Sequence, residues 1–116
     1  MTTPAFLKSL QEPVRNEIVL VGVSSVVVSQ ARQGGERRKS ITIRNNSPNA
    51  IDIITLNFGQ QNAVANTGIT LRQYESVTDA SDRDEDDPQS HGYSTFQGVI
   101  TAICATANGS LSVMER

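Results

Sequence analysis

From Glu17 to its carboxyl end, the chain is a series of short β-like runs separated by turn residues. This pattern limits the fold more than any other feature. Val, Ile and Thr supply 30 residues, against six Leu and nine Ala. Because β-branched side chains suit a pleated surface, the balance favours strands over helices. The spacing of the runs predicts an all-β sandwich or barrel with six to eight strands.

The first half of this region predicts several strands. The segment 17–30 is either one long strand bent near Gly22 or two strands joined at Ser24-Ser25. The next run, 38–45, points Ile41 and Ile43 to one face and Ser40, Thr42 and Arg44 to the other. A dense turn signal over 45–49 then leads to a strand over 50–58, with Ile51, Ile53 and Thr55 predicted on one face.

The second half continues in the same way. A polar loop over 59–66 precedes short strands at 68–71 and 75–77, and a long strand covers 96–106. Asn108-Gly109 is a strong hairpin signal, so the segments 99–106 and 111–115 are expected to pair with each other across it.

The first 16 residues have no β pattern and contain two of the four prolines. We therefore divide the chain into an arm, 1–16, and a β domain, 17–116. The arm is extended or forms a short helix, in which Phe6, Leu7 and Leu10 would share one apolar face until Pro13. Such a short helix is marginal alone, so this face needs a surface to dock on. A frayed terminus without a function is the alternative.

Composition removes several classes of function. One Cys and one His cannot supply a structural zinc site or an internal disulfide, and the apolar run around Cys104 indicates a small buried residue. The net charge of -2 gives no reason to expect nucleic acid as the main partner. The longest apolar stretch, 18–28, is too short to cross a bilayer. The amino terminus does not resemble a signal peptide, which favours folding in a reducing cytoplasm.

An acidic run occupies residues 78–90, with six acidic residues and one Arg. Asp82, Asp84 and Asp86 alternate as in an EF-hand loop, but Asp87 replaces the required Gly and Tyr93 replaces the final Glu. The run is therefore interpreted as a solvated loop. An irregular cation site and an acidic tip that meets a basic partner are alternatives.

A basic cluster precedes the acidic run and has the opposite charge. It consists of Arg32, Arg37, Arg38, Lys39 and Arg44, offset by Glu36 alone. Nucleic-acid binding would need aromatic stacking platforms, which this neighbourhood lacks. A contact between copies, basic strand against acidic loop, and ordinary surface charge are the remaining interpretations.

No catalytic motif is present in the sequence. His91 lies beside Gly92 in a polar segment, and its adjacency to Ser90 does not make a nucleophile and base. Carboxylates in a wet loop would not hold the separation that acid-base chemistry requires. We expect neither an enzyme nor a bound cofactor or metal.

The strand pattern resembles the small β-sandwich virion proteins of tailed bacteriophages, of the capsid cement or decoration type. The segments that carry the likeness are 38–45, 51–58, 66–71, 96–103 and 111–115. The resemblance implies an antiparallel, jelly-roll-like sandwich that binds the major capsid protein and bridges shell subunits. It also implies a location in the virion after synthesis in the host cytoplasm.

The contacts expected on this basis use the arm, the basic cluster and the acidic loop. The candidate residues are Phe6, Leu7, Leu10, Arg37, Arg38, Lys39, Asp82, Asp84 and Asp86. A dimer or trimer is expected, because repeated weak contacts add through avidity. The alternatives are a head-fibre, tail or baseplate module and a carbohydrate-binding sandwich that uses Tyr93. A hydrolase acting through the acidic loop is a further class.

Overall fold

The computed structural model describes residues 15–32, 37–80 and 95–116, and these residues form strands without a helix. The strands are β1 (Arg15–Val21), β2 (Val26–Ser29), β3 (Ser40–Asn45), β4 (Ile54–Phe58), β5 (Ile69–Leu71), β6 (Ser76–Ala80), β7 (Ile100–Cys104) and β8 (Gly109–Glu115). They form two antiparallel sheets, so the predicted all-β sandwich with six to eight strands is confirmed.

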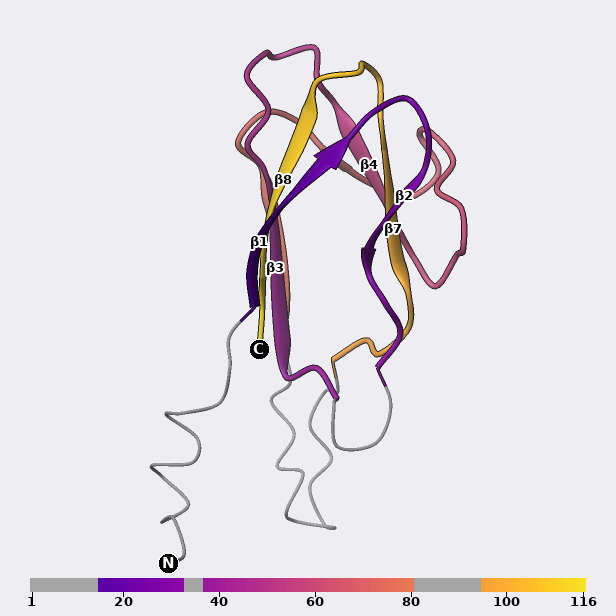
Figure 1. The fold of residues 1–116 in the computed structure, drawn as a ribbon, viewed down its shortest axis with the longest axis vertical. Coiled ribbons are helices and arrows are strands. Elements are labelled where there is room, and N and C mark those ends of the chain that lie inside the picture. Colours follow the sequence, from indigo (N-terminus) through magenta and orange to yellow (C-terminus); the bar gives the residue numbers. More distant parts are fainter. Residues whose placement is uncertain (1–14, 33–36, 81–94) are drawn as a thin grey trace, which may run out of the picture.

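The strand order is that of a jelly roll. Sheet A has the order β1-β8-β3-β6 and sheet B the order β2-β7-β4-β5. The pairings nest around the middle of the chain: β4 pairs with β5, β3 with β6, β2 with β7 and β1 with β8. A long hairpin folded over on itself gives this pattern and places most consecutive strands in opposite sheets. Figure 1 shows the two layers, with β1, β8 and β3 in one and β2, β7 and β4 in the other.

The core lies between the sheets and is almost entirely aliphatic. Its buried members are Val21, Val28, Ile41, Ile43, Ile54, Leu56, Leu71, Ile100, Ala102, Cys104, Leu111 and Val113. Ile41 and Ile43 point inward as predicted, and Cys104 is a buried free thiol among them. Phe58 and Phe96 pack at the margin with their ring centroids 5.4 Å apart.

The segment 17–30 forms two strands rather than one bent strand. β1 ends at Val21, and the chain crosses to the other sheet before β2 begins at Val26. β1 also begins earlier than the predicted domain boundary, because Arg15 and Asn16 pair with the end of β8. The sandwich therefore includes two residues that the sequence had assigned to the arm.

The strand predicted over 50–58 is wrong in its length and in its phase. β4 begins at Ile54, and its inward residues are Ile54 and Leu56. Thr55 points to the outer face instead, and Ile51 is 70% exposed.

A side-chain turn explains this error. The Asp52 carboxylate accepts the Asn49 N–H, and the Asp52 N–H donates to the Asn49 carbonyl oxygen. Asp52 is fully buried in this turn, so the extended strand starts only after it. Since side chains alternate along a strand, a shift of one residue exchanges the two faces.

The hairpin predicted at Asn108-Gly109 is also wrong. β7 and β8 belong to different sheets and do not pair with each other. The turn that Asn-Gly favours needs positive φ at both residues, and neither residue has one here. The segment carries the chain between the sheets, and Gly109 approaches the Val21 carbonyl oxygen so closely that a Cβ would collide with it.

The outer face of sheet B is covered by the loop 59–68. Three hydrogen bonds attach the loop: Ala63 N–H to Ser25 Oγ (2.7 Å), Asn66 N–H to Thr55 Oγ1 (3.2 Å) and the Thr101 hydroxyl to the Gln60 carbonyl oxygen (2.9 Å). As a result, Thr55 and Thr101 are buried although they point away from the core. Sheet B is thus covered by sheet A on its inner face and by the loop 59–68 on its outer face.

Candidate functional site

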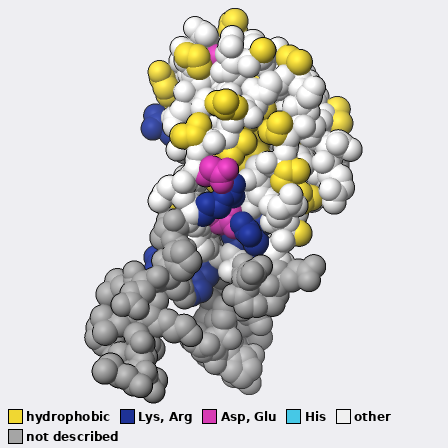
Figure 2. Space-filling view, in the orientation of Figure 1, with side chains coloured by type: hydrophobic (Ala, Val, Ile, Leu, Met, Phe, Trp, Pro, Cys, Tyr) yellow, Lys and Arg dark blue, Asp and Glu magenta, His cyan; other side chains and the backbone are white. Residues whose placement is uncertain are grey.

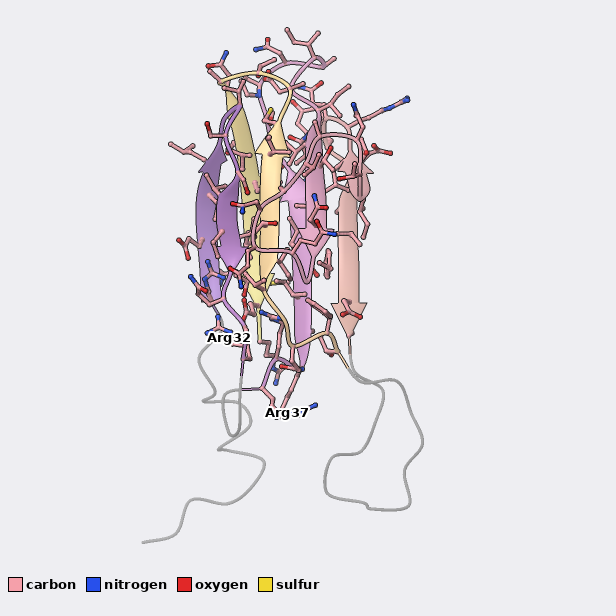
Figure 3. The ribbon with its side chains drawn as sticks, turned by 90° about the vertical axis from the view of Figure 1, so that its right-hand side faces the viewer. Arg32 and Arg37 are labelled. Carbon is pink, nitrogen blue, oxygen red and sulfur yellow. The ribbon has the colours of Figure 1, made fainter. Side chains whose placement is uncertain are left out.

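The basic residues that are close in sequence lie in three different environments. Arg32 and Arg37 stand at one end of the sandwich, on either side of 33–36 (Figure 3). Arg37 and Lys39 are exposed there, as a surface role requires. Arg44 lies toward the other end of β3, with its guanidinium 5.5 Å from the centroid of the Tyr74 ring.

Arg38 is a correction to the predicted surface cluster, because its side chain is buried with 3% exposure. Its Nη2 donates to Ser29 Oγ and to the Gln30 carbonyl oxygen, both at 2.8 Å. Its Nη1 donates to the carbonyl oxygens of Phe96 and Gly98. A guanidinium with these partners is not available to bind another molecule.

Glu115, at the end of β8, is the buried carboxylate that balances this charge. Its Oε1 lies 2.7 Å from Arg32 Nε and 3.5 Å from Arg38 Nε. Its Oε2 accepts the Ser29 hydroxyl at 2.8 Å and lies 3.1 Å from Arg15 Nη1. We call Arg15, Ser29, Arg32, Arg38 and Glu115 the ion network.

The pKa values of the two buried groups follow from these contacts. Burial lowers the pKa of Arg38, and the Glu115 carboxylate opposes that shift. Burial alone would raise the pKa of Glu115, but the hydrogen bonds from Arg32 and Ser29 and the nearby positive charges lower it below its ordinary value. Glu115 therefore remains ionised near neutral pH and is not suited to act as a general acid.

The ion network joins the two sheets at one end. Arg15 and Glu115 belong to β1 and β8 of sheet A, and Ser29 belongs to β2 of sheet B. Arg38 reaches from the start of β3 to the segment before β7. Because every charged group has an opposite partner and the centre is buried, the arrangement is structural: it fixes how the sheets meet.

The outer face of sheet A is left open by the described chain. Twelve side chains point outward from its strands: Asn16, Ile18, Leu20, Ser40, Thr42, Arg44, Ser76, Thr78, Ala80, Ser110, Ser112 and Met114. We call this surface the A face. Eleven of the twelve are uncharged, and the exposed fractions of Ile18, Leu20 and Met114 are 59%, 75% and 50%. Depletion of charge is typical of the centre of a protein interface.

The registers place these side chains in rows across the sheet. One row runs Ile18, Ser112, Arg44, Ser76, and the next runs Asn16, Met114, Thr42, Thr78. The Thr42 and Thr78 hydroxyls are 3.0 Å apart, so they satisfy each other. The A face therefore has hydroxyl groups over β8, β3 and β6 and its exposed branched aliphatic side chains, Ile18 and Leu20, over β1.

Most of the paired charges of the described residues lie at one end of the sandwich. Figure 2 shows a group of acidic and basic side chains low on the described surface, with hydrophobic side chains scattered above it and isolated charged side chains at the upper left edge and near the top. The exposed hydrophobic residues of β1, β2 and the segment between them include Ile18, Leu20, Val23 and Val27. This flank of the sandwich is thus apolar and uncharged above the ion network.

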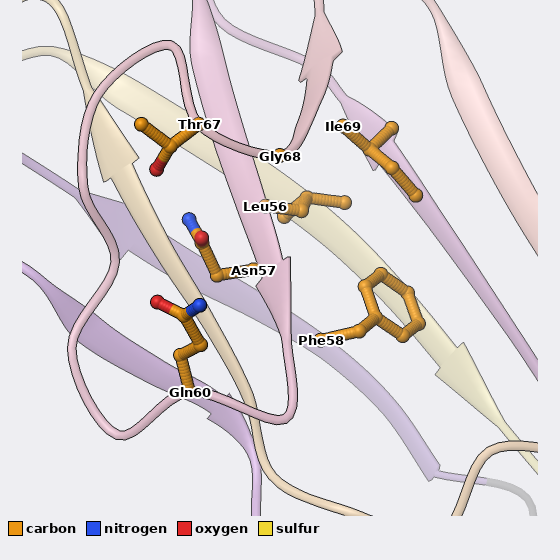
Figure 4. A pocket seen from close by; sticks show the side chains of 7 residues that line it. All are labelled: Leu56, Asn57, Phe58, Gln60, Thr67, Gly68 and Ile69. Atoms are coloured by element: carbon orange, nitrogen blue, oxygen red, sulfur yellow. The ribbon is translucent and has the colours of Figure 1, made fainter.

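A shallow depression of about 240 Å³ lies beside the end of β4 (Figure 4). Its lining residues are Leu56, Asn57, Phe58, Gln60, Thr67, Gly68 and Ile69. The polar side chains lie to one side of β4 and the large apolar ones to the other, so they do not converge on one ligand. Asn57 lines the depression, and its Nδ2 is buried without a hydrogen-bond partner among the described residues.

The remaining sequence candidates fall outside the described residues. These are Phe6, Leu7, Leu10, Asp82, Asp84 and Asp86, together with His91 and Tyr93. Within 15–32, 37–80 and 95–116, no group of three His, Cys, Asp or Glu side chains could hold a metal ion. The same residues include no helix long and apolar enough to span a membrane.

The sequence interpretation missed Glu115, Ser29 and Arg15. A signal for Glu115 was present, because it has the same parity as Leu111 and Val113 in an alternating strand. A carboxylate at a core-facing position requires a buried partner. Arg15 and Ser29 carry no comparable signal, since only the fold brings them to β8.

Comparisons with known proteins found no relative. No family model matches the chain, and neither a curated protein nor a solved structure matches it.

Proposed function

We propose that the protein is a structural component of a virus particle that binds the assembled shell and stabilises it by bridging capsid subunits. The observation that carries the proposal is the A face, an open sheet surface with one charged side chain among twelve. The partner is the major capsid protein, as the resemblance of the strand pattern implies. The location is the virion.

The fold supports this proposal without deciding it. Viral capsid domains use the jelly roll, but lectin domains and cupins use it too, so function must be argued from the surface. The A face offers an area of about 400 Å², taking four strands about 4.8 Å apart and about 20 Å of strand length. One such contact is small for a stable complex, so binding would depend on several copies acting together.

The ion network suits this function because it resists separation of the two sheets. A module that bridges shell subunits is pulled through its attached face, and the ion network, together with the hydrogen bond from Phe96 N–H to the Asp79 carboxylate, ties sheet A to sheet B at that end. Glu115 and Arg38 link strands that are distant in sequence, so a pull on sheet A is shared with sheet B.

Co-sedimentation with shells assembled from the major capsid protein tests the proposal. We expect saturable binding of the wild type and at least a tenfold weaker binding of Ser112→Lys, which places a charge in the middle of the A face. Val64→Lys is the matched control, because Val64 is 53% exposed on the loop that covers sheet B. Absence of binding, or equal loss in both variants, would contradict the proposal.

The same experiment separates the alternatives. Electron micrographs that place the protein on a fibre, tail or baseplate would assign it to another structure of the particle. A carbohydrate-binding module would instead bind glycans without shells. Among the described residues, Tyr74 is an exposed aromatic ring, and the Arg44 guanidinium already lies over it.

The contribution of the arm to shell binding is tested by removing residues 1–14, because β1 begins at Arg15. We expect the truncated protein to fold and the decorated particle to lose heat stability. Unchanged particle stability would remove the arm from the proposed contact.

A further inference from the structure

The four edge strands of the sandwich differ in how well they are protected against pairing with another chain. β1, β2, β5 and β6 each pair with one neighbour, so each has one side of backbone N–H and C=O groups without a strand partner in the described structure. Such an edge is a template for another strand unless the sequence or geometry blocks it.

Three of these edges carry a blocking feature. β5 has only three residues, and β2 has four with a register shift between Val27 and Ser29. β6 has five residues, presents only Ser76, Thr78 and Ala80 outward, and overlaps the start of the acidic run, which continues beyond it in the sequence. Short strands, bulges and charged flanks are known devices against edge pairing.

β1 carries none of these features along most of its length. Its seven residues pair with β8 in continuous register, and 18–21 are Ile, Val, Leu and Val. Ile18 and Leu20 point outward and are 59% and 75% exposed. The charges of β1 lie at its start, where Arg15 and Glu17 are already paired 2.6 Å apart. A long, continuous and apolar edge of this kind is incomplete as the surface of a monomer.

We infer that β1 pairs with β1 of a second copy in antiparallel orientation, about a two-fold axis at Val19. A strand can always meet itself in this way, because antiparallel pairing is compatible with two-fold symmetry. In this register Ile18 of each copy lies opposite Leu20 of the other, and the two Val19 residues lie opposite each other. Glu17 lies opposite Val21, so no like charges face each other.

The pairing joins two A faces into one continuous surface. Two four-stranded sheets become one sheet of eight, and the exposed aliphatic side chains of β1 meet at its centre. The contact is smaller than a standard interface, so we expect a dissociation constant on the order of 10–100 μM. The inference does not depend on the identity of the shell, since it concerns two copies of this chain alone.

Sedimentation velocity of the full chain without shells tests the inference. We expect a monomer–dimer equilibrium in the wild type and at least a tenfold larger dissociation constant for Leu20→Lys. Thr78→Lys is the matched control, since Thr78 points outward from the opposite edge of the same sheet. A monomer at every concentration, or a dimer that Leu20→Lys does not weaken, would overturn the inference.

A disulfide variant tests the register independently. Val19→Cys places two thiols opposite each other at the two-fold axis, where paired Cα atoms are about 4.5–5.5 Å apart, within the range that a disulfide spans. We expect a covalent dimer on mild oxidation of Val19→Cys and none for Thr78→Cys. The native Cys104 is buried in the core and does not compete. Equal crosslinking of both variants, or none of Val19→Cys, would contradict the pairing. Because these experiments contain no shells, they can fail while shell binding by the A face holds.

Discussion

The outer faces of the two sheets differ in what covers them. The outer face of sheet B is covered by the loop 59–68, which is attached through hydrogen bonds to the strands beneath it. No described residue covers the outer face of sheet A, which exposes Ile18, Leu20 and Met114. Both sheets have four strands and share one core, so the core does not explain the difference. The loop 59–68 completes the outer face of sheet B, and we interpret the A face, which the described residues leave open, as the surface for partners.

Without a cover from the described residues on its outer face, sheet A should be held to sheet B by the core and the ion network. Outside the core, we therefore expect substitution of Glu115 to cause the largest loss of stability. We expect Glu115→Ala to lower the free energy of unfolding by about 3–5 kcal/mol, because removal of one buried partner leaves uncompensated charge. Urea unfolding at pH 7 measures this loss.

The control for this variant is Glu17→Ala. Glu17 also pairs with Arg15, but its side chain is 50% exposed, so its loss should cost about 0–1 kcal/mol. Equal losses in the two variants would mean that the ion network does not hold sheet A.

The same carboxylate predicts a pH dependence. The folded-state pKa of Glu115 is lowered, so its contribution to stability is present above the unfolded-state value of about 4.3 and is lost as the pH falls through the folded-state pKa. The difference in unfolding free energy between wild type and Glu115→Gln should therefore be largest near pH 7 and shrink toward pH 3. Urea unfolding across this range measures it, and a difference that grows on acidification would contradict the assignment.

Substitutions in the loop 59–68 should lower the free energy of unfolding less than Glu115→Ala, because the loop lies on the outer face of sheet B and not in the core. A Cβ at Gly68 would collide with the Leu56 carbonyl oxygen, so Gly68→Ala must push β5 away from β4. We expect a loss of about 1–3 kcal/mol in the free energy of unfolding. Gly22→Ala is the control, since the nearest atom to its Cβ would be 4.0 Å away. Equal stability of the two variants would show that the loop is not packed as described.

Substitutions in the A face should affect stability less than those in the ion network or in the loop that covers sheet B. Ser112→Lys, the variant that should lose shell binding, is expected to change the free energy of unfolding by no more than about 0.5 kcal/mol. Thermal unfolding measures this alongside binding. A large destabilisation would mean that Ser112 belongs to the packing of the sandwich and not to an open surface.

The all-β class was predictable from the sequence because alternation and turn residues are local signals. Ile41 and Ile43 show this: their spacing gave the correct inward face of β3. The error in β4 arose from a local side-chain turn at Asp52, and the hairpin error arose where non-local contacts override local preference. Asn108-Gly109 favours a hairpin, but the nested pairing of a jelly roll places β7 and β8 in different sheets.

The candidate site was less predictable than the fold. Arg38 lies in a run of basic residues, and only the return of β8 to β1 and β3 brings Glu115 to it. The A face has no motif either, because its residues come from four strands distant in sequence. Its signal is the repeated absence of charge at outward positions, which becomes visible only when the registers are known.

The most direct test of the account is oxidative footprinting of Met114 in the free protein and in the protein bound to shells. Met114 is 50% exposed within the A face, and a side-by-side β1 pairing would leave it accessible. Val64, on the cover of sheet B, is the internal reference. We predict that shell binding protects Met114 strongly while the reactivity of Val64 is unchanged. Equal reactivity of Met114 in the free and bound protein would contradict the claim that the open face of sheet A is the binding surface.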